Sequence, residues 1–193
     1  MSFDVRKDAP RLFGRWVFAT SWGWLLGFVF MMIGGIAADL LLSAERSQFF
    51  LGLGMGAGIG YAQVRVTARF LGITNSWAWA SVIGMGAPFV ASDIVRGVWT
   101  GLPYLYSLWL SAACGGLFVG LLQRPMLRPH SPRANWWVPA SIAGWTLAAA
   151  TPLLYGTLPG GAVGALINVA AIPLGGLILG VVTGGTLVWM LRH

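Results

Sequence analysis

Two acidic residues lie in long apolar stretches, where few other side chains could do chemistry. Asp39 lies near the end of the first stretch, and Asp93 near the end of the third, with Arg96 three residues later. An ionisable side chain in an apolar segment is costly and suggests a functional site. One interpretation is an interfacial Asp93–Arg96 pair that ends a helix. The alternative joins Asp39 and Asp93 in a site for a cation or a proton, open to the outer face.

Residues suited to covalent or metal chemistry are scarce. A serine or cysteine nucleophile needs a base beside it, yet His130 and His193 occupy a proline-rich turn and the last position. The single cysteine, Cys114, excludes a disulfide framework within the chain. We therefore predict no enzyme, no catalytic residue and no metal site. Whether the chain binds a cofactor stays open. Gln63 or Gln123 could be the axial ligand of a pigment, which is the weaker interpretation of these two residues.

The elements that must position these residues are long apolar helices. The chain of 193 residues is 57% hydrophobic and only 9% charged, and its mean hydropathy is +0.76. A soluble domain carries roughly a quarter charged residues, and a membrane span needs ~20 apolar residues. Six stretches qualify: about 16–41, 48–64, 77–95, 104–123, 136–155 and 163–191. We therefore expect an all-α integral membrane protein with six transmembrane helices in one domain, 1–193.

Basic residues gather in alternate connectors. Opposite these, only Arg46 and Arg96 are basic. The positive-inside rule makes the richer side cytoplasmic, including residues 1–15. Both termini are therefore expected on the cytoplasmic side of a bacterial inner membrane that the chain crosses several times. The basic residues form no amphipathic face, so we expect no nucleic-acid partner despite the net charge of +7. The richer side holds ten basic residues: Arg6, Lys7, Arg11, Arg15, Arg65, Arg69, Arg124, Arg128, Arg133 and Arg192.

Two short templates each occur three times along the chain. The first, Trp-x-x-Ala-Ser/Thr-x-x-Gly, begins at Trp16, Trp77 and Trp137. The second template is a Gly-x-x-x-Gly pair followed three residues later by a glutamine or a leucine. Its copies are Gly56 and Gly60 with Gln63, Gly116 and Gly120 with Gln123, and Gly180 and Gly184 with Leu187. The templates predict three tandem helical hairpins, over about 16–64, 77–123 and 136–191.

The template residues are explained by helix packing. Small residues four apart let membrane helices approach closely, so we expect the glycine pairs to be packing surfaces, and we place the tryptophans at the headgroup level. Gln63 and Gln123 would form hydrogen bonds between helices, or would be polar ligands in a pocket.

The connector after the fourth stretch combines arginine with tryptophan. Arg124, Arg128 and Arg133, with Trp136 and Trp137, could contact anionic lipid headgroups or an acidic partner surface. The alternative is that they only set topology and form an aromatic belt.

Residues 116–145 carry a resemblance to a group of proteins. Their Gly-x-x-x-Gly-x-x-Gln helix, arginine-containing turn and Asn-Trp-Trp-x-x-Ala-Ser-x-x-Gly helix resemble uncharacterised membrane proteins of cyanobacteria and Chloroflexi. The first hairpin departs from that pattern after Gln63. The resemblance implies a similar fold and no known activity.

The expected function follows from these features. We expect a non-catalytic accessory or scaffold subunit that packs against membrane lipids and other membrane protein subunits, and organises lipid or pigment around a larger complex. The alternative is a small solute transporter, or a substrate-binding membrane component, with a pocket between the hairpins.

Overall fold

The computed structural model describes residues 5–42, 48–99, 103–151 and 162–192. Every long element there is an α-helix: α1 (Val5–Leu42), α2 (Phe49–Leu71), α3 (Asn75–Val98), α4 (Tyr104–Leu127), α5 (Trp137–Ala150) and α6 (Ala162–Leu191), with one 3₁₀ turn, η1 (Ala134–Trp136). The all-α prediction is confirmed for the described residues.

Four of these helices are long and apolar enough to cross a membrane. They are the segments Asp8–Ala38 of α1, Asn75–Val98 of α3, Tyr106–Leu127 of α4 and Ile172–Leu191 of α6. The chain therefore has the character of a membrane protein. α2 has 23 residues, about as many as α3 and α4, but its five glycines and two arginines lower its hydropathy. α5 has only 14 described residues.

Two boundaries differ from the sequence-based expectation. Residues 5–15 belong to α1 and continue into its apolar part without a break. Pro10 lies in the second turn of this helix, where it lacks the N–H that would bond to the carbonyl of residue 6. α2 extends seven residues beyond the expected end at residue 64, because Gly72 stops it in a left-handed conformation with φ of 67°. Residues 152–155 of the fifth expected stretch lie outside the described residues.

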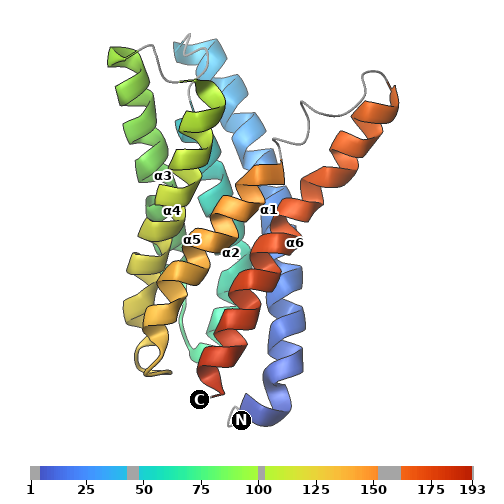
Figure 1. Cartoon of the computed structure of the whole chain (residues 1–193), viewed down its shortest axis with the longest axis vertical. Helices are drawn as coiled ribbons and strands as arrows, with labels where there is room; N and C mark the ends of the chain where they lie inside the picture. Colours follow the sequence, from blue (N-terminus) through green and yellow to red (C-terminus); the bar gives the residue numbers. More distant parts are fainter. Residues whose placement is uncertain (1–4, 43–47, 100–102, 152–161, 193) are drawn as a thin grey trace.

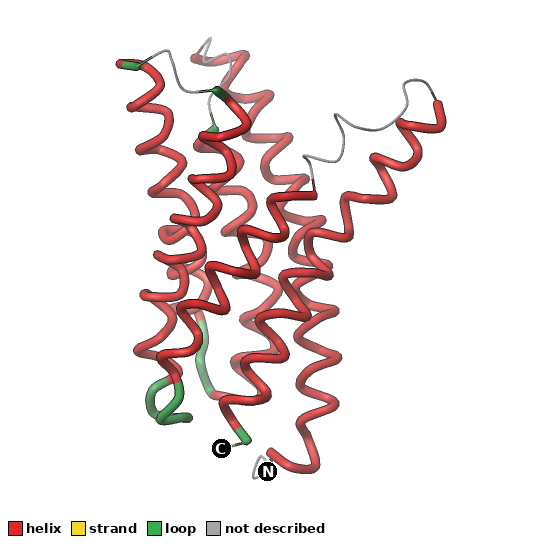
Figure 2. The backbone as a smooth tube through the Cα atoms, in the orientation of Figure 1, coloured by secondary structure: helices red, strands yellow, loops and turns green. Residues whose placement is uncertain are grey.

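The six helices form a closed ring. Each helix packs against its neighbours in sequence, and α6 packs back against α1 (Figure 1). The start of α1 and the end of α6 lie at one end of the bundle, together with the α2–α3 and α4–α5 connections (Figure 2). We call this the basic end, because it brings together the described arginine side chains Arg11, Arg15, Arg65, Arg69, Arg124, Arg128, Arg133 and Arg192.

The interior of the ring has two apolar layers. The layer at the basic end surrounds Trp16, Trp77 and Trp137. The second layer, farther from that end, contains Trp24, Trp145, Phe89 and residues from all six helices around them. Large apolar side chains also cover the outside of the ring, among them Leu40, Phe18, Trp79, Ile94 and Tyr106. Such an apolar exterior suits a lipid or protein environment.

Candidate functional site

Three tryptophans meet at the centre of the basic end. Trp16, Trp77 and Trp137 are 0–2% exposed, and their ring centroids are 5.6–5.8 Å apart in all three pairs. We call them the tryptophan triad. They come from α1, α3 and α5 and point to the inside of the bundle, where they are buried among one another. Edge-on and tilted aromatic contacts at this spacing are favourable beyond the area they bury.

Two glutamines connect the triad to the helices around it. The Trp77 indole N–H donates to Gln63 Oε1 (3.0 Å), and the Gln63 amide donates to Thr20 Oγ1 (3.0 Å). Gln123 repeats the pattern: it accepts from Trp137 Nε1 (2.9 Å) and donates to Ser81 Oγ (2.9 Å). Each glutamine therefore bridges three helices. Buried polar groups that are fully hydrogen-bonded fix one arrangement of their neighbours.

The third position of this network is built differently. Leu187 occupies the place of the glutamine and cannot accept a hydrogen bond. Instead, Thr183, one turn earlier on α6, accepts the Trp16 indole N–H at 2.9 Å and donates to the Leu179 carbonyl. The sequence templates drew attention to Gln63, Gln123 and Leu187 but missed Thr183, because it lies outside the repeated positions.

The repeated glycines lie where helix backbones touch. A Cβ on the first glycine of each Gly-x-x-x-Gly pair would crowd the next helix in the ring: Gly56 would lie 2.5 Å from the Ser81 carbonyl of α3, Gly116 2.8 Å from the Ser141 carbonyl of α5, and Gly180 3.0 Å from Val17 Cα of α1. The second glycines, Gly60, Gly120 and Gly184, would meet the same three helices. The last of these contacts closes the ring between α6 and α1.

A second set of glycines lies at the contacts within the pairs α1–α2, α3–α4 and α5–α6. Cβ atoms on Gly23, Gly84 and Gly144 would lie 2.7–2.9 Å from atoms of α2, α4 and α6, respectively. In α2, Gly54 and Gly58 face α1, whereas Gly56 faces α3. The extra glycines therefore give α2 two flat faces, which places it in close contact with both neighbours.

The axis of the bundle is filled at the level of the glutamines. The space bordered by Gln63, Gln123, Ser141 and Thr183 is only about 10 Å³, close to the least volume that holds one water molecule. Farther from the basic end, an apolar cavity of about 60 Å³ lies among Trp24, Met55, Phe89 and their neighbours.

Asp93 lies at the end of the bundle opposite the basic end, where it caps a helix. Its carboxylate accepts the backbone N–H groups of Gln48 and Phe49, at 2.8–2.9 Å, and lies 3.6 Å from the Arg96 guanidinium. A carboxylate at a helix N-terminus is stabilised by the helix dipole and by the free N–H groups. These contacts favour the interpretation of Asp93 and Arg96 as a structural pair. Asp39 belongs to α1, but its side chain lies outside the described residues.

The residues of the α4–α5 connection that were predicted to contact lipid or a partner have different surroundings in the structure. Trp136 is 58% exposed and stacks edge-on against Trp189 of α6 at 5.9 Å, while the Arg133 guanidinium lies 4.9 Å from the same Trp189 ring. Arg128 is exposed and Arg124 is half-buried. Trp137 differs from the expectation: it is buried in the tryptophan triad and does not face lipid, because η1 turns its side chain inward.

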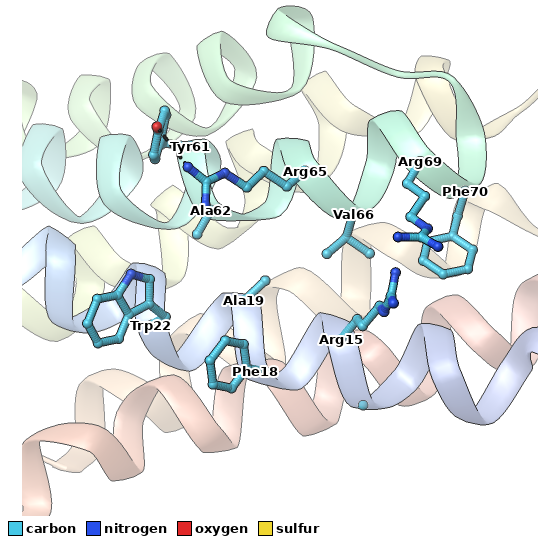
Figure 3. A pocket seen from close by; sticks show the side chains of 11 residues that line it. Arg15, Phe18, Ala19, Trp22, Tyr61, Ala62, Arg65, Val66, Arg69 and Phe70 are labelled. Carbon is cyan, nitrogen blue, oxygen red and sulfur yellow. Dashed lines mark hydrogen bonds between the residues drawn. The ribbon is translucent and has the colours of Figure 1, made fainter.

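A groove at the basic end was not foreseen from the sequence. It lies between α1 and α2, has a volume of about 410 Å³, and is lined by Arg15, Arg65 and Arg69 together with aromatic side chains (Figure 3). No sequence pattern indicated it, because Arg15 comes from a different helix and is 50 residues from Arg65.

In the described part of the chain, no three His, Cys, Asp or Glu side chains gather as they would to hold a metal ion. The distinct features are therefore the tryptophan–glutamine network, the glycine contacts and the basic groove. Comparisons of this chain with protein-family models, with curated proteins and with solved structures find no match.

Proposed function

We propose that this chain is a non-catalytic integral membrane protein that packs as an accessory or scaffold subunit beside a larger membrane complex and its lipids. The observation that carries the proposal is the contrast between a filled axis and an apolar exterior. The tryptophan triad and its amides close the centre of the basic end. Large exposed side chains, by contrast, cover the outside of the ring, where lipids and other subunits would bind.

The proposal includes six spans arranged as three hairpins. α2 has 23 residues, which is about 35 Å of helix and enough to cross ~30 Å of hydrocarbon. It packs between α1 and α3, both of which are candidate spans. α5 packs in the same way between α4 and α6. With the basic end in the cytoplasm, both termini would lie on the cytoplasmic side of an inner membrane.

Topology is tested by cysteine labelling at the two ends of the bundle. In a Cys114→Ala background, His130→Cys should react with a membrane-impermeant maleimide only after the cytoplasmic side is opened, while Gly97→Cys should react from outside. Both sites suit labelling: His130 is exposed in the α4–α5 connection, and a Cβ on Gly97 meets nothing within 4 Å. Labelling of both positions from the same side would contradict the six-span arrangement.

The scaffold role is tested by removing both bridging amides. The double variant Gln63→Leu, Gln123→Leu loses four hydrogen bonds, worth about 2 kcal/mol at ~0.6 kcal/mol each in membrane bundles. Leucine should fit, because Leu187 already occupies the equivalent place on α6. We expect the variant to fold, to insert and to co-purify in mild detergent with the same membrane partner as the natural chain.

One observation keeps the transporter as a second candidate. The apolar cavity of about 60 Å³ includes Trp24, whose buried indole N–H has no acceptor among the described residues. A small apolar solute with one acceptor atom could use both features. Under this alternative, the chain would purify without a partner, and the glutamine double variant would stay folded but lose uptake, because the triad and its amides would form the gate.

A further inference from the structure

We infer that the groove between α1 and α2 binds the phosphate headgroup of an anionic phospholipid, with an acyl chain along its apolar part. This inference rests on the proposed insertion in a membrane and adds a partner to it. The groove opens at the basic end and has a volume of about 410 Å³. Its three arginines face a space bordered by two helices (Figure 3).

Two of the three guanidinium groups of the groove lie beside aromatic rings. The Arg15 Cζ lies 5.9 Å from the centroid of Phe70, and the Arg65 Cζ lies 5.4 Å from that of Tyr61. Arg65 also donates to the Tyr61 hydroxyl at 3.2 Å. Stacking on a ring orients a guanidinium and leaves N–H groups at its edge available to an anion. Arginine is well suited to phosphate because two parallel N–H groups can bind two oxygens.

No described carboxylate forms an ion pair with the arginines of the groove. In the described part of the chain the ion pairs are Asp8–Arg11 and Asp93–Arg96, so Arg15, Arg65 and Arg69 form none. Three unpaired cations beside one cavity favour an anionic occupant.

The part of the groove farther from the basic end matches an acyl chain. Phe18 and Trp22 of α1 line it, three and seven residues beyond Arg15, and are 73% and 60% exposed. Arg65 lies six residues before the end of α2, and its guanidinium extends to Tyr61, one turn farther from the basic end (Figure 3). Arg15 and Arg69 therefore lie at the end of the groove where a headgroup would bind, and Arg65 lies beside the apolar surface that an acyl chain would cover.

The test is lipid binding to the purified full chain in neutral detergent, followed by native mass spectrometry. We expect phosphatidylglycerol to bind more tightly than phosphatidylcholine. The triple variant Arg15→Gln, Arg65→Gln, Arg69→Gln should lose tenfold or more in affinity for phosphatidylglycerol, since one cation near an anionic surface contributes on the order of a fivefold change. The control, Arg128→Gln, Arg133→Gln, Arg192→Gln, removes the same charge at the same end and should change affinity less than about threefold.

Three results would overturn the inference. Equal losses in the two triple variants would show that only net charge matters. Equal binding of the two lipids would remove the phosphate headgroup selectivity. Tight binding of glycerol phosphate, which has no acyl chains, would assign the groove to a soluble anion. These readouts are independent of any protein partner, and failure of membrane insertion would instead appear in the labelling of His130→Cys and Gly97→Cys.

Discussion

Replacing Trp77 with alanine is expected to lower the free energy of unfolding by about 3–5 kcal/mol, the range for removing a large buried aromatic side chain. Trp77 is fully buried, touches both other members of the tryptophan triad and donates to Gln63. The substitution leaves a cavity at the point where α1, α3 and α5 meet, and it leaves Gln63 Oε1 without its donor. Thermal unfolding in detergent, followed by tryptophan fluorescence, would measure the loss.

The matched control lies two residues along the same helix. Trp79 is 64% exposed, so Trp79→Ala removes a side chain of equal size from the outer surface and should cost less than about 1 kcal/mol in detergent. Similar losses in the two variants would contradict the placement of Trp77 at the centre of the bundle.

A leucine at Gly58 is expected to separate α1 from α2 and to lower the free energy of unfolding by about 3 kcal/mol or more. A Cβ there would contact the backbone of Gly27, and would lie 2.5 Å from the carbonyl oxygen of Gly23. Backbone atoms cannot rotate away as a side chain can, so both helices must move apart along their length. Overpacking of a core typically costs about 1–3 kcal/mol, and occasionally more; this contact of two backbones lies at the upper end.

Gly35→Leu is the control for Gly58→Leu. Gly35 belongs to α1, and a Cβ on it would meet nothing within 4 Å, so the larger side chain should be accommodated with little change in the unfolding temperature. Size-exclusion elution and thermal unfolding of the two variants give the comparison. If Gly58→Leu were as stable as Gly35→Leu, the close contact of α1 with α2 would be wrong.

Part of this structure could be predicted from the sequence because it depends on local physics. The length of each apolar stretch predicted helices, and α3 and α4 lie close to the expected ranges of 77–95 and 104–123. Helix ends were less accurate, because capping decides them: Gly72 ends α2, and Asp93, distant in sequence, caps its start.

The orientation of the tryptophans could not be predicted in the same way. Helical spacing places Trp16, Thr20 and Gly23 on one face, but in an apolar environment both the interior and the surroundings accept such a face. The orientation of Trp16 depends on its hydrogen-bond acceptor, which is Thr183 of α6, 167 residues away. Only the closure of the ring brings that pair together.

The sequence by itself determined the apolar, helical character of the chain, the asymmetric distribution of its basic residues and the positions of its small residues, because these are properties of composition and of spacing along a helix. Only the tertiary structure decided which helix each glycine contacts, where the indoles point and how Arg15 reaches the arginines of α2. These depend on contacts between segments far apart in the chain. Such contacts are chosen by the packing of all six helices at once, and no local pattern encodes them.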